Sequence, residues 1–204
     1  MMIDLLARAE IGAALPLPPP ARTGELSVEQ ALSGRRSHRR YLPRPLSLEQ
    51  ISQLLWAAQG ITAPDRRRAA PSAGACYPLE LYLVCAEGVF RYLPDGHRLR
   101  KSLARDIRAD LAAAAGGQDF IAQAPVSLVF SAVLERTTAR YRERGIRYVH
   151  MDVGIAAENV HLQAEALGLG SVSVGAFDDA AVAKVVEMPQ PEEALYIIPV
   201  GRKG

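Results

Sequence analysis

The chain of 204 residues has little lysine and little cysteine. Of its 24 Lys and Arg residues only Lys101, Lys184 and Lys203 are lysines, and the formal net charge is +2. So small a basic excess argues against a protein that binds nucleic acid, because such proteins carry a strong basic surplus. The two cysteines, Cys76 and Cys85, form neither a CxxC pair nor a cluster with zinc-ligand spacing. We therefore expect two small buried thiols and no metal site.

The chain also lacks the patterns that mark membrane and dinucleotide-binding proteins. No apolar run reaches the roughly 18 residues that a membrane span requires. The apolar N-terminal stretch contains Asp4 and Glu10 and breaks at Pro16, which is unlike a signal peptide. No GxGxxG lies between a strand and a helix, as a Rossmann domain would require. We expect no membrane partner and a cytoplasmic location.

What remains is a globular α and β pattern, with 49% hydrophobic and 23% charged residues. Residues 1–25 form a proline-rich N-terminal lead-in, and 26–204 form a single domain. Capping boxes at Ser27 and Ser47 predict two helix starts. Alternation in 79–86 predicts a strand with Leu79 and Cys85 on the same face. Further expected strands are 89–93, 126–133, 171–175 and 194–201, and further expected helices are 102–115, 152–168 and 178–186.

An arginine cluster is the first candidate for chemistry. Arg35, Arg36 and Arg39 flank Ser37 just after the first predicted helix, and Arg202 follows the last predicted strand. Guanidinium groups and a hydroxyl next to a helix end can bind a phosphate monoester through charge-assisted hydrogen bonds. A solvated basic loop or a contact to nucleic acid would give the same local pattern.

Two loops of small residues are the other candidates. The first, at 71–78, places Ser72, Ala73 and Gly74 between prolines, so its backbone can approach a flat ligand closely. The second, at 173–178, ends a strand and begins a helix, which leaves free backbone N–H groups together. Either loop alone also fits a simple turn with nothing bound.

The order of these motifs resembles the nitroreductase family, from about residue 26 to residue 202. More narrowly, it is similar to the branch of dehydrogenases that oxidise azoline rings in modified peptides. The motifs that carry the resemblance are RRSHRRY (35–41), LSLEQISQLLWAAQGI (46–61), PSAGACYPLELYLV (71–84), VGAFDD (174–179) and PVGR (199–202).

The resemblance implies an α+β fold, with a mostly antiparallel sheet flanked by helices, in an intertwined homodimer. It also implies one FMN at each of two sites in the dimer interface. Two-electron hydride transfer through flavin N5 would act on a small molecule or a peptide-derived substrate. NAD(P)H or another electron donor or acceptor would complete the cycle, and the protein would supply binding and electrostatics.

By resemblance, each motif takes a role at the flavin. The phosphate and ribityl chain would be bound by Arg35, Arg36, Ser37, Arg39 and Arg202. The ring would be reached by Pro71, Ser72, Ala73 and Gly74 of the other protomer, by Gln118, and by the backbone of Val174, Gly175 and Ala176.

Two departures from the family pattern leave the activity open. Where peptide-modifying members carry a Lys-Tyr pair for proton removal, this chain has Arg140-Tyr141, and arginine is a poor base. Tyr141 is therefore the candidate catalytic residue. Ala75 stands where nitroreductases that reduce nitroaromatic compounds usually have Asn. A non-catalytic flavin-binding or redox-sensing protein is the alternative, and neither the substrate nor the direction of the reaction follows from the sequence.

Overall fold

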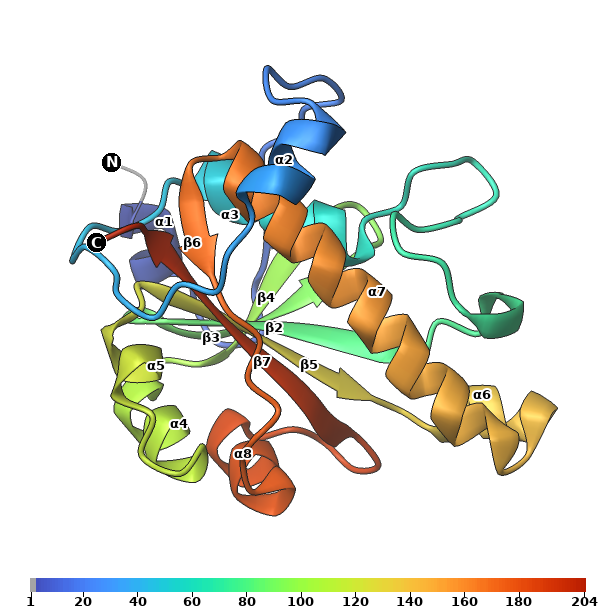
Figure 1. Cartoon of the computed structure of the whole chain (residues 1–204). Helices are drawn as coiled ribbons and strands as arrows, with labels where there is room; N and C mark the ends of the chain where they lie inside the picture. Colours follow the sequence, from blue (N-terminus) through green and yellow to red (C-terminus); the bar gives the residue numbers. More distant parts are fainter. Residues whose placement is uncertain (1–2) are drawn as a thin grey trace.

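The computed structural model describes residues 3–204, and one antiparallel sheet of seven strands forms its centre (Figure 1). The strand order is β1-β4-β3-β2-β5-β7-β6, and every neighbouring pair is antiparallel. The strands are β1 (Ala14–Pro16), β2 (Leu79–Cys85), β3 (Gly88–Leu93), β4 (Arg98–Leu103), β5 (Val126–Ala132), β6 (Leu169–Ser171) and β7 (Glu193–Arg202). The mostly antiparallel sheet of the α+β fold expected from the sequence is therefore confirmed for one chain.

Helices cover both faces of this sheet. The helices are α1 (Ile3–Arg8), α2 (Val28–Gly34), α3 (Leu48–Gln59), α4 (Arg108–Ala114), α5 (Asp119–Gln123), α6 (Glu135–Tyr141), α7 (Arg144–Ala166) and α8 (Asp179–Val186), with a 3-10 turn η1 (Ala73–Ala75). In Figure 1 the long α7 crosses one face together with α2 and α3, while α4, α5 and α8 lie on the other. Each face buries its own hydrophobic cluster.

The central strands are apolar on both sides because both faces are covered. In β2, Leu81 and Leu83 pack toward α3 and α7, whereas Tyr82 and Val84 pack toward α4 and α8. The predicted alternation from Leu79 to Cys85 is confirmed. Cys85 is buried as expected, but the prediction for Cys76 is wrong, because its side chain is partly exposed.

The N-terminal lead-in contributes to the sheet. Its β1 pairs with β4, with Ala14 opposite Arg100, and Leu17 is buried in the core. The buried Lys101 on β4 donates from Nζ to the carbonyl oxygen of Leu6 at 3.2 Å, which ties α1 to the sheet.

Several predicted elements were shifted or missed. The expected helix 102–115 is wrong in its first part, because residues up to Leu103 form β4 and the helix begins at Arg108. The helix predicted at 152–168 starts earlier, at Arg144, because its first turns expose charged side chains that hide the apolar stripe. The predicted strand 171–175 is instead Leu169–Ser171, and α5 and α6 were not expected.

The contact of α3 with α7 and the sheet should dominate stability. Leu54 is fully buried there, so we expect Leu54→Ala to lower the free energy of unfolding by about 2–5 kcal/mol. Ile11 is 65% exposed, and Ile11→Ala should change it by less than about 0.5 kcal/mol. Urea denaturation followed by circular dichroism measures both, and equal losses would contradict this packing.

Candidate active site

Residues 35–42 leave α2 and run along the edge of the sheet. The backbone N–H of His38 donates to the carbonyl oxygen of Ser171 on β6 at 3.0 Å. The N–H of Leu42 donates to the carbonyl oxygen of Arg202, at the end of β7, also at 3.0 Å. These bonds bring the predicted arginine cluster beside Arg202, although the two motifs lie at opposite ends of the sequence.

The guanidinium groups of this edge are only weakly paired within the chain. Arg35 is partly exposed, and its Nε lies 3.7 Å from the Glu158 carboxylate on α7. Arg36 donates to the carbonyl oxygens of Ser33 and Arg35, and so caps the end of α2. Arg39 and Arg202 are exposed and form no ion pair within residues 3–204.

A row of hydroxyl groups lies next to these cations. Ser37 pairs with Ser171 through a parallel β-bridge. The buried His161 on α7 lies 2.7 Å from the Ser171 hydroxyl through Nδ1 and 2.7 Å from the Ser173 hydroxyl through Nε2. Burial, helped by the charge of Arg35, lowers the pKa of His161 to about 4, so this imidazole is neutral near pH 7. The edge therefore offers cations, hydroxyls and a neutral imidazole, which suits an oxyanion ligand. We name residues 35–39, Ser171, Ser173 and Arg202 the cradle.

The loop between β6 and α8 meets Gln118 at the same end of the sheet. The Gln118 amide donates from Nε2 to the carbonyl oxygen of Ala176 at 3.0 Å. Val174 is fixed by a two-way backbone pair with Ile197 on β7. Gly175 and Ala176 follow it and are exposed, so their backbones are accessible to a ligand. Arg39 of the cradle lies beside α5, with its guanidinium 5.8 Å from the centre of the Phe120 ring, two residues after Gln118.

The loop 71–74 lies against the N-terminal half of α7. The Ala73 N–H lies 3.3 Å from both carboxylate oxygens of the buried Asp152. Burial raises the pKa of this carboxyl group, while hydrogen bonds from Ser72 and Ala73 oppose the rise. Gly74 has φ +58°, a conformation that favours glycine, and its missing side chain leaves room for the Tyr141 hydroxyl, which a Cβ there would approach to 2.5 Å. Arg140 donates to the Gly74 carbonyl oxygen at 3.2 Å.

The predicted site residues thus form two separate groups. Arg35, Arg36, Ser37, Arg39 and Arg202 lie around the cradle, with Gln118, Val174, Gly175 and Ala176 beyond them. Pro71, Ser72, Ala73 and Gly74 lie with Tyr141 at a second position. Along α7 the two groups contact Glu158 and Asp152, which are about 9 Å apart on the helix axis.

Two side chains that organise these groups were not predicted from the sequence. His161 was not distinguished from the other histidines, and Asp152 was not singled out. One available signal was the pair Ser171 and Ser173, since hydroxyls two residues apart on extended chain face the same side. His150, on the exposed side of α7, has no such neighbours.

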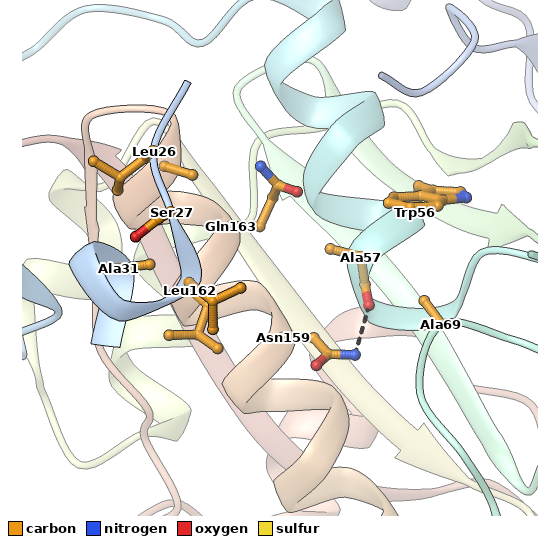
Figure 2. A pocket seen from close by; sticks show the side chains of 11 residues that line it. Leu26, Ser27, Ala31, Trp56, Ala57, Ala69, Asn159, Leu162 and Gln163 are labelled. Atoms are coloured by element: carbon orange, nitrogen blue, oxygen red, sulfur yellow. Dashed lines mark hydrogen bonds between the residues drawn. The ribbon is translucent and has the colours of Figure 1, made fainter. Parts of the chain in front are cut away.

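An apolar hollow lies where α2, α3 and α7 meet. It has a volume of about 260 Å³, and Figure 2 shows Leu26 and Leu162 on one side and Trp56 and Ala57 on the other. Asn159 on α7 donates to the Ala57 carbonyl oxygen at 3.1 Å and closes its floor.

Metal and membrane features are absent from the part of the chain that the structure describes. Residues 3–204 contain no group of three or more His, Cys, Asp and Glu side chains able to hold a metal ion. None of the helices described is long and apolar enough to cross a membrane.

Comparison with known proteins decides the family. The model of the nitroreductase family matches residues 32–202. The chain belongs to the nitroreductase family. It is 45% identical over 185 residues to a protein of Methanocaldococcus jannaschii that bears the name nitroreductase MJ1384, covering 88% of this chain and 92% of the relative. The crystal structure of a protein of Ralstonia eutropha JMP134 described as a nitroreductase superposes with a TM-score of 0.86 at 31% identity, covering 94% of this chain and 90% of that one.

Two further members of the family have more specific names. The microcin B17-processing protein McbC of Escherichia coli is 28% identical over 167 residues, which cover 75% of this chain and 61% of McbC. An FMN reductase [NAD(P)H] of Bacillus subtilis is 27% identical over 187 residues, which cover 85% of this chain and 62% of the reductase. The predicted resemblance to the nitroreductase family, including the peptide-modifying branch, is confirmed by these matches.

The buried His161 should make stability depend on pH. Because its pKa is about 4 when folded and near 6.5 when unfolded, the unfolded chain binds a proton in this range and the folded chain does not. The free energy of unfolding should therefore fall as pH drops from 6.5 to 4, by up to roughly 3 kcal/mol.

Urea denaturation at several pH values tests this contribution. His161→Gln should remove most of the slope. A smaller part of the same sign from His97, whose pKa burial also lowers, and a part of opposite sign from Asp152, whose pKa burial raises, should remain. His150→Gln, at an exposed position of the same helix, is the matched control and should keep the full slope. An unchanged slope in His161→Gln would show that this imidazole does not titrate as described.

Proposed function

We propose that the protein is an FMN-dependent oxidoreductase that acts by two-electron hydride transfer on a small molecule or a peptide-derived substrate. The observation that carries the proposal is the cradle, where exposed arginines, serine hydroxyls and backbone N–H groups from distant segments converge. This donor set suits a phosphate monoester, and the chain belongs to a family in which an FMN reductase is found. We also propose that the protein is located in the cytoplasm, because its two cysteines form no disulfide.

The cradle fits the phosphate end of FMN. Arg35, Arg39 and Arg202 would donate to the phosphate oxygens, and Ser37 would add a hydroxyl. Arg36 would support the end of α2, from which this segment starts. The neutral His161 would hold the hydroxyls of Ser171 and Ser173 in place without adding charge.

The loop 71–74 fits the flat ring. Its small residues leave room for a ring to approach the backbone, and Gly74 lets Tyr141 lie directly against the loop. Gln118, Gly175 and Ala176 would present an amide and backbone N–H groups at the edge of the ring. Bound FMN would supply hydride chemistry at its N5, and the chain would bind, orient and shield it.

Tyr141 is the candidate for proton handling. Its ring packs edge to face on Tyr148 at 5.2 Å, and its hydroxyl faces the backbone of Gly74. The neighbouring Arg140 stays protonated and is held on the Gly74 carbonyl oxygen, so it would orient the loop. Proton transfer to or from the substrate would therefore use the Tyr141 hydroxyl.

We further propose a homodimer in which each flavin contacts both protomers, with NAD(P)H or another donor or acceptor exchanging electrons. Large apolar side chains that are exposed on α2 and α7 support this proposal, because exposed apolar groups of this size often mark an interface. On α2, Val28 is 65% exposed and Leu32 55%; on α7, Met151 is 53% and Ile155 43% exposed, and both lie beside residues 71–73.

Binding of FMN to the apoprotein, measured by quenching of flavin fluorescence, tests the proposed phosphate site. Arg35→Ala combined with Arg202→Ala removes two charged donors, so we expect the Kd to rise by about 100-fold or more. Arg105→Ala is the matched control, since Arg105 is exposed, paired with Asp110 and not part of the cradle. An unchanged Kd in the double variant would place the phosphate elsewhere.

A heterodimer tests whether two chains share each flavin. One chain carries Arg35→Ala and Arg202→Ala, the other carries Gly74→Val, and two different affinity tags isolate the mixed dimer. If each site joins the cradle of one chain to the 71–74 loop of the other, one site is intact and the heterodimer binds about half the normal FMN. Neither variant homodimer should retain FMN. If each site lay within one chain, the mixed dimer would bind none.

A further inference from the structure

A polar cavity, distinct from the apolar hollow of Figure 2, lies beside the loop 61–68 and away from the cradle. Its volume is about 300 Å³, and it is bounded by Ile61 and Arg68 on one side, Ala75 and Tyr77 on another, and Pro94 of the turn after β3. None of the cradle residues lines it.

The run Arg66-Arg67-Arg68 at this cavity contains one cation without a counter-ion. Arg66 pairs with Asp95 at 2.7 Å, and Arg67 pairs with Asp65 at 2.8 Å, both as exposed ion pairs. Within residues 3–204, Arg68 forms no ion pair. It donates from one nitrogen to the neutral Gln59 side chain at 2.7 Å.

The surroundings of Arg68 leave its remaining donors free. Its guanidinium stacks on the Tyr77 ring, 4.6 Å from the ring centre. The nearby Glu80 is already bound by Arg91 and Arg136. Burial lowers the pKa of Arg68, and the nearby carboxylates of Glu80 and Asp95, which pair with other arginines, only partly oppose this shift. A partly buried guanidinium group with free donors can pair with the carboxylate of an incoming ligand through charge-assisted hydrogen bonds.

The backbone around the cavity is also strained. Arg66, Ala75 and Tyr77 have φ values of 67°, 55° and 47°, in the left-handed region that side chains other than glycine rarely adopt. All three line the same cavity. Such strain concentrates at ligand sites, where the surrounding structure holds the backbone in place.

We propose that this cavity binds the carboxylate of a small organic acid, with Arg68 as the forked donor. The apolar body of the acid would contact Ile61, Pro94 and the Tyr77 ring. A monoanion fits better than a phosphate dianion, because the carboxylates of Asp65 and Asp95 line the same cavity and would repel a second charge.

This site would act on the proposed flavin loop through the backbone. Residues 71–77 contact Asp152 through Ala73 and the cavity through Ala75 and Tyr77. An acid bound at Arg68 would therefore hold the same loop from a second position. Binding itself does not depend on flavin, so the site can be tested whatever the outcome for FMN.

Calorimetric titration of the purified protein with cyclohexanecarboxylate tests the proposal, because the puckered ring of this probe does not stack on a flavin. Arg68→Met should raise its Kd by about 10- to 100-fold. Arg68→Lys keeps the charge but loses the fork, and should lose part of the affinity. Arg105→Met, an exposed arginine that is paired with Asp110 and does not line the cavity, is the matched control and should bind as the wild type does.

One neutral analogue, one charged analogue and one structural measurement complete the test. Cyclohexanecarboxamide should not bind, and cyclohexyl phosphate should bind more weakly than the carboxylate. In the wild type, amide resonances of Ala75 and Tyr77 should shift on addition of the carboxylate, which needs no variant to fold. No binding, equal binding by Arg68→Met, tighter binding of the phosphate, or unshifted resonances would each overturn the proposal.

Discussion

The pairing of residues 35–42 with β6 and the end of β7 is the constraint on which the candidate active site depends. Backbone bonds from His38 to Ser171 and from Leu42 to Arg202 fix a polar, arginine-rich segment on the sheet edge. Without them the guanidinium groups would be mobile surface charges, which bind anions weakly. With them, the cations share one edge with the serine hydroxyls that His161 holds.

Helix α7 relates this edge to the second group of site residues. It is 23 residues long, and it contacts Arg35 through Glu158 and the loop 71–74 through Asp152. Both acids work as positioning groups, one for a cation and one for a backbone N–H. Because both acids lie on one helix, α7 sets the spacing between the contact to the cradle and the contact to the loop. In a dimer of the proposed kind, the same helix would also define the distance between the two flavins.

The helices and strands that could be predicted are those whose local sequence pattern matches the burial of their side chains in the folded chain. The capping boxes at Ser27 and Ser47 start α2 and α3 as expected, and the alternation of 79–86 gives β2. Strand β4 escaped prediction because the charged Lys101 occupies an inward position, where tertiary contacts with Leu6 and Phe90 satisfy it.

For the site, the motifs indicated which residues matter but not how they are held. The arginine cluster and Arg202 were recognised together through family resemblance. Their shared edge depends on backbone pairing between distant segments, which no local pattern reports. The same reason hid His161, whose role depends on Ser171 and Ser173, and the unpaired Arg68, whose neighbours pair among themselves.

The central claim is that this chain binds FMN and passes hydride through it. An anaerobic titration of the purified, FMN-reconstituted protein with NAD(P)H, followed by visible absorption, tests it most directly. The account predicts a yellow protein that loses its colour as the donor is added and regains it with an acceptor. A protein that stays colourless after reconstitution would contradict flavin binding. A yellow protein inert to every donor and acceptor would contradict hydride transfer and favour a non-catalytic flavin-binding role.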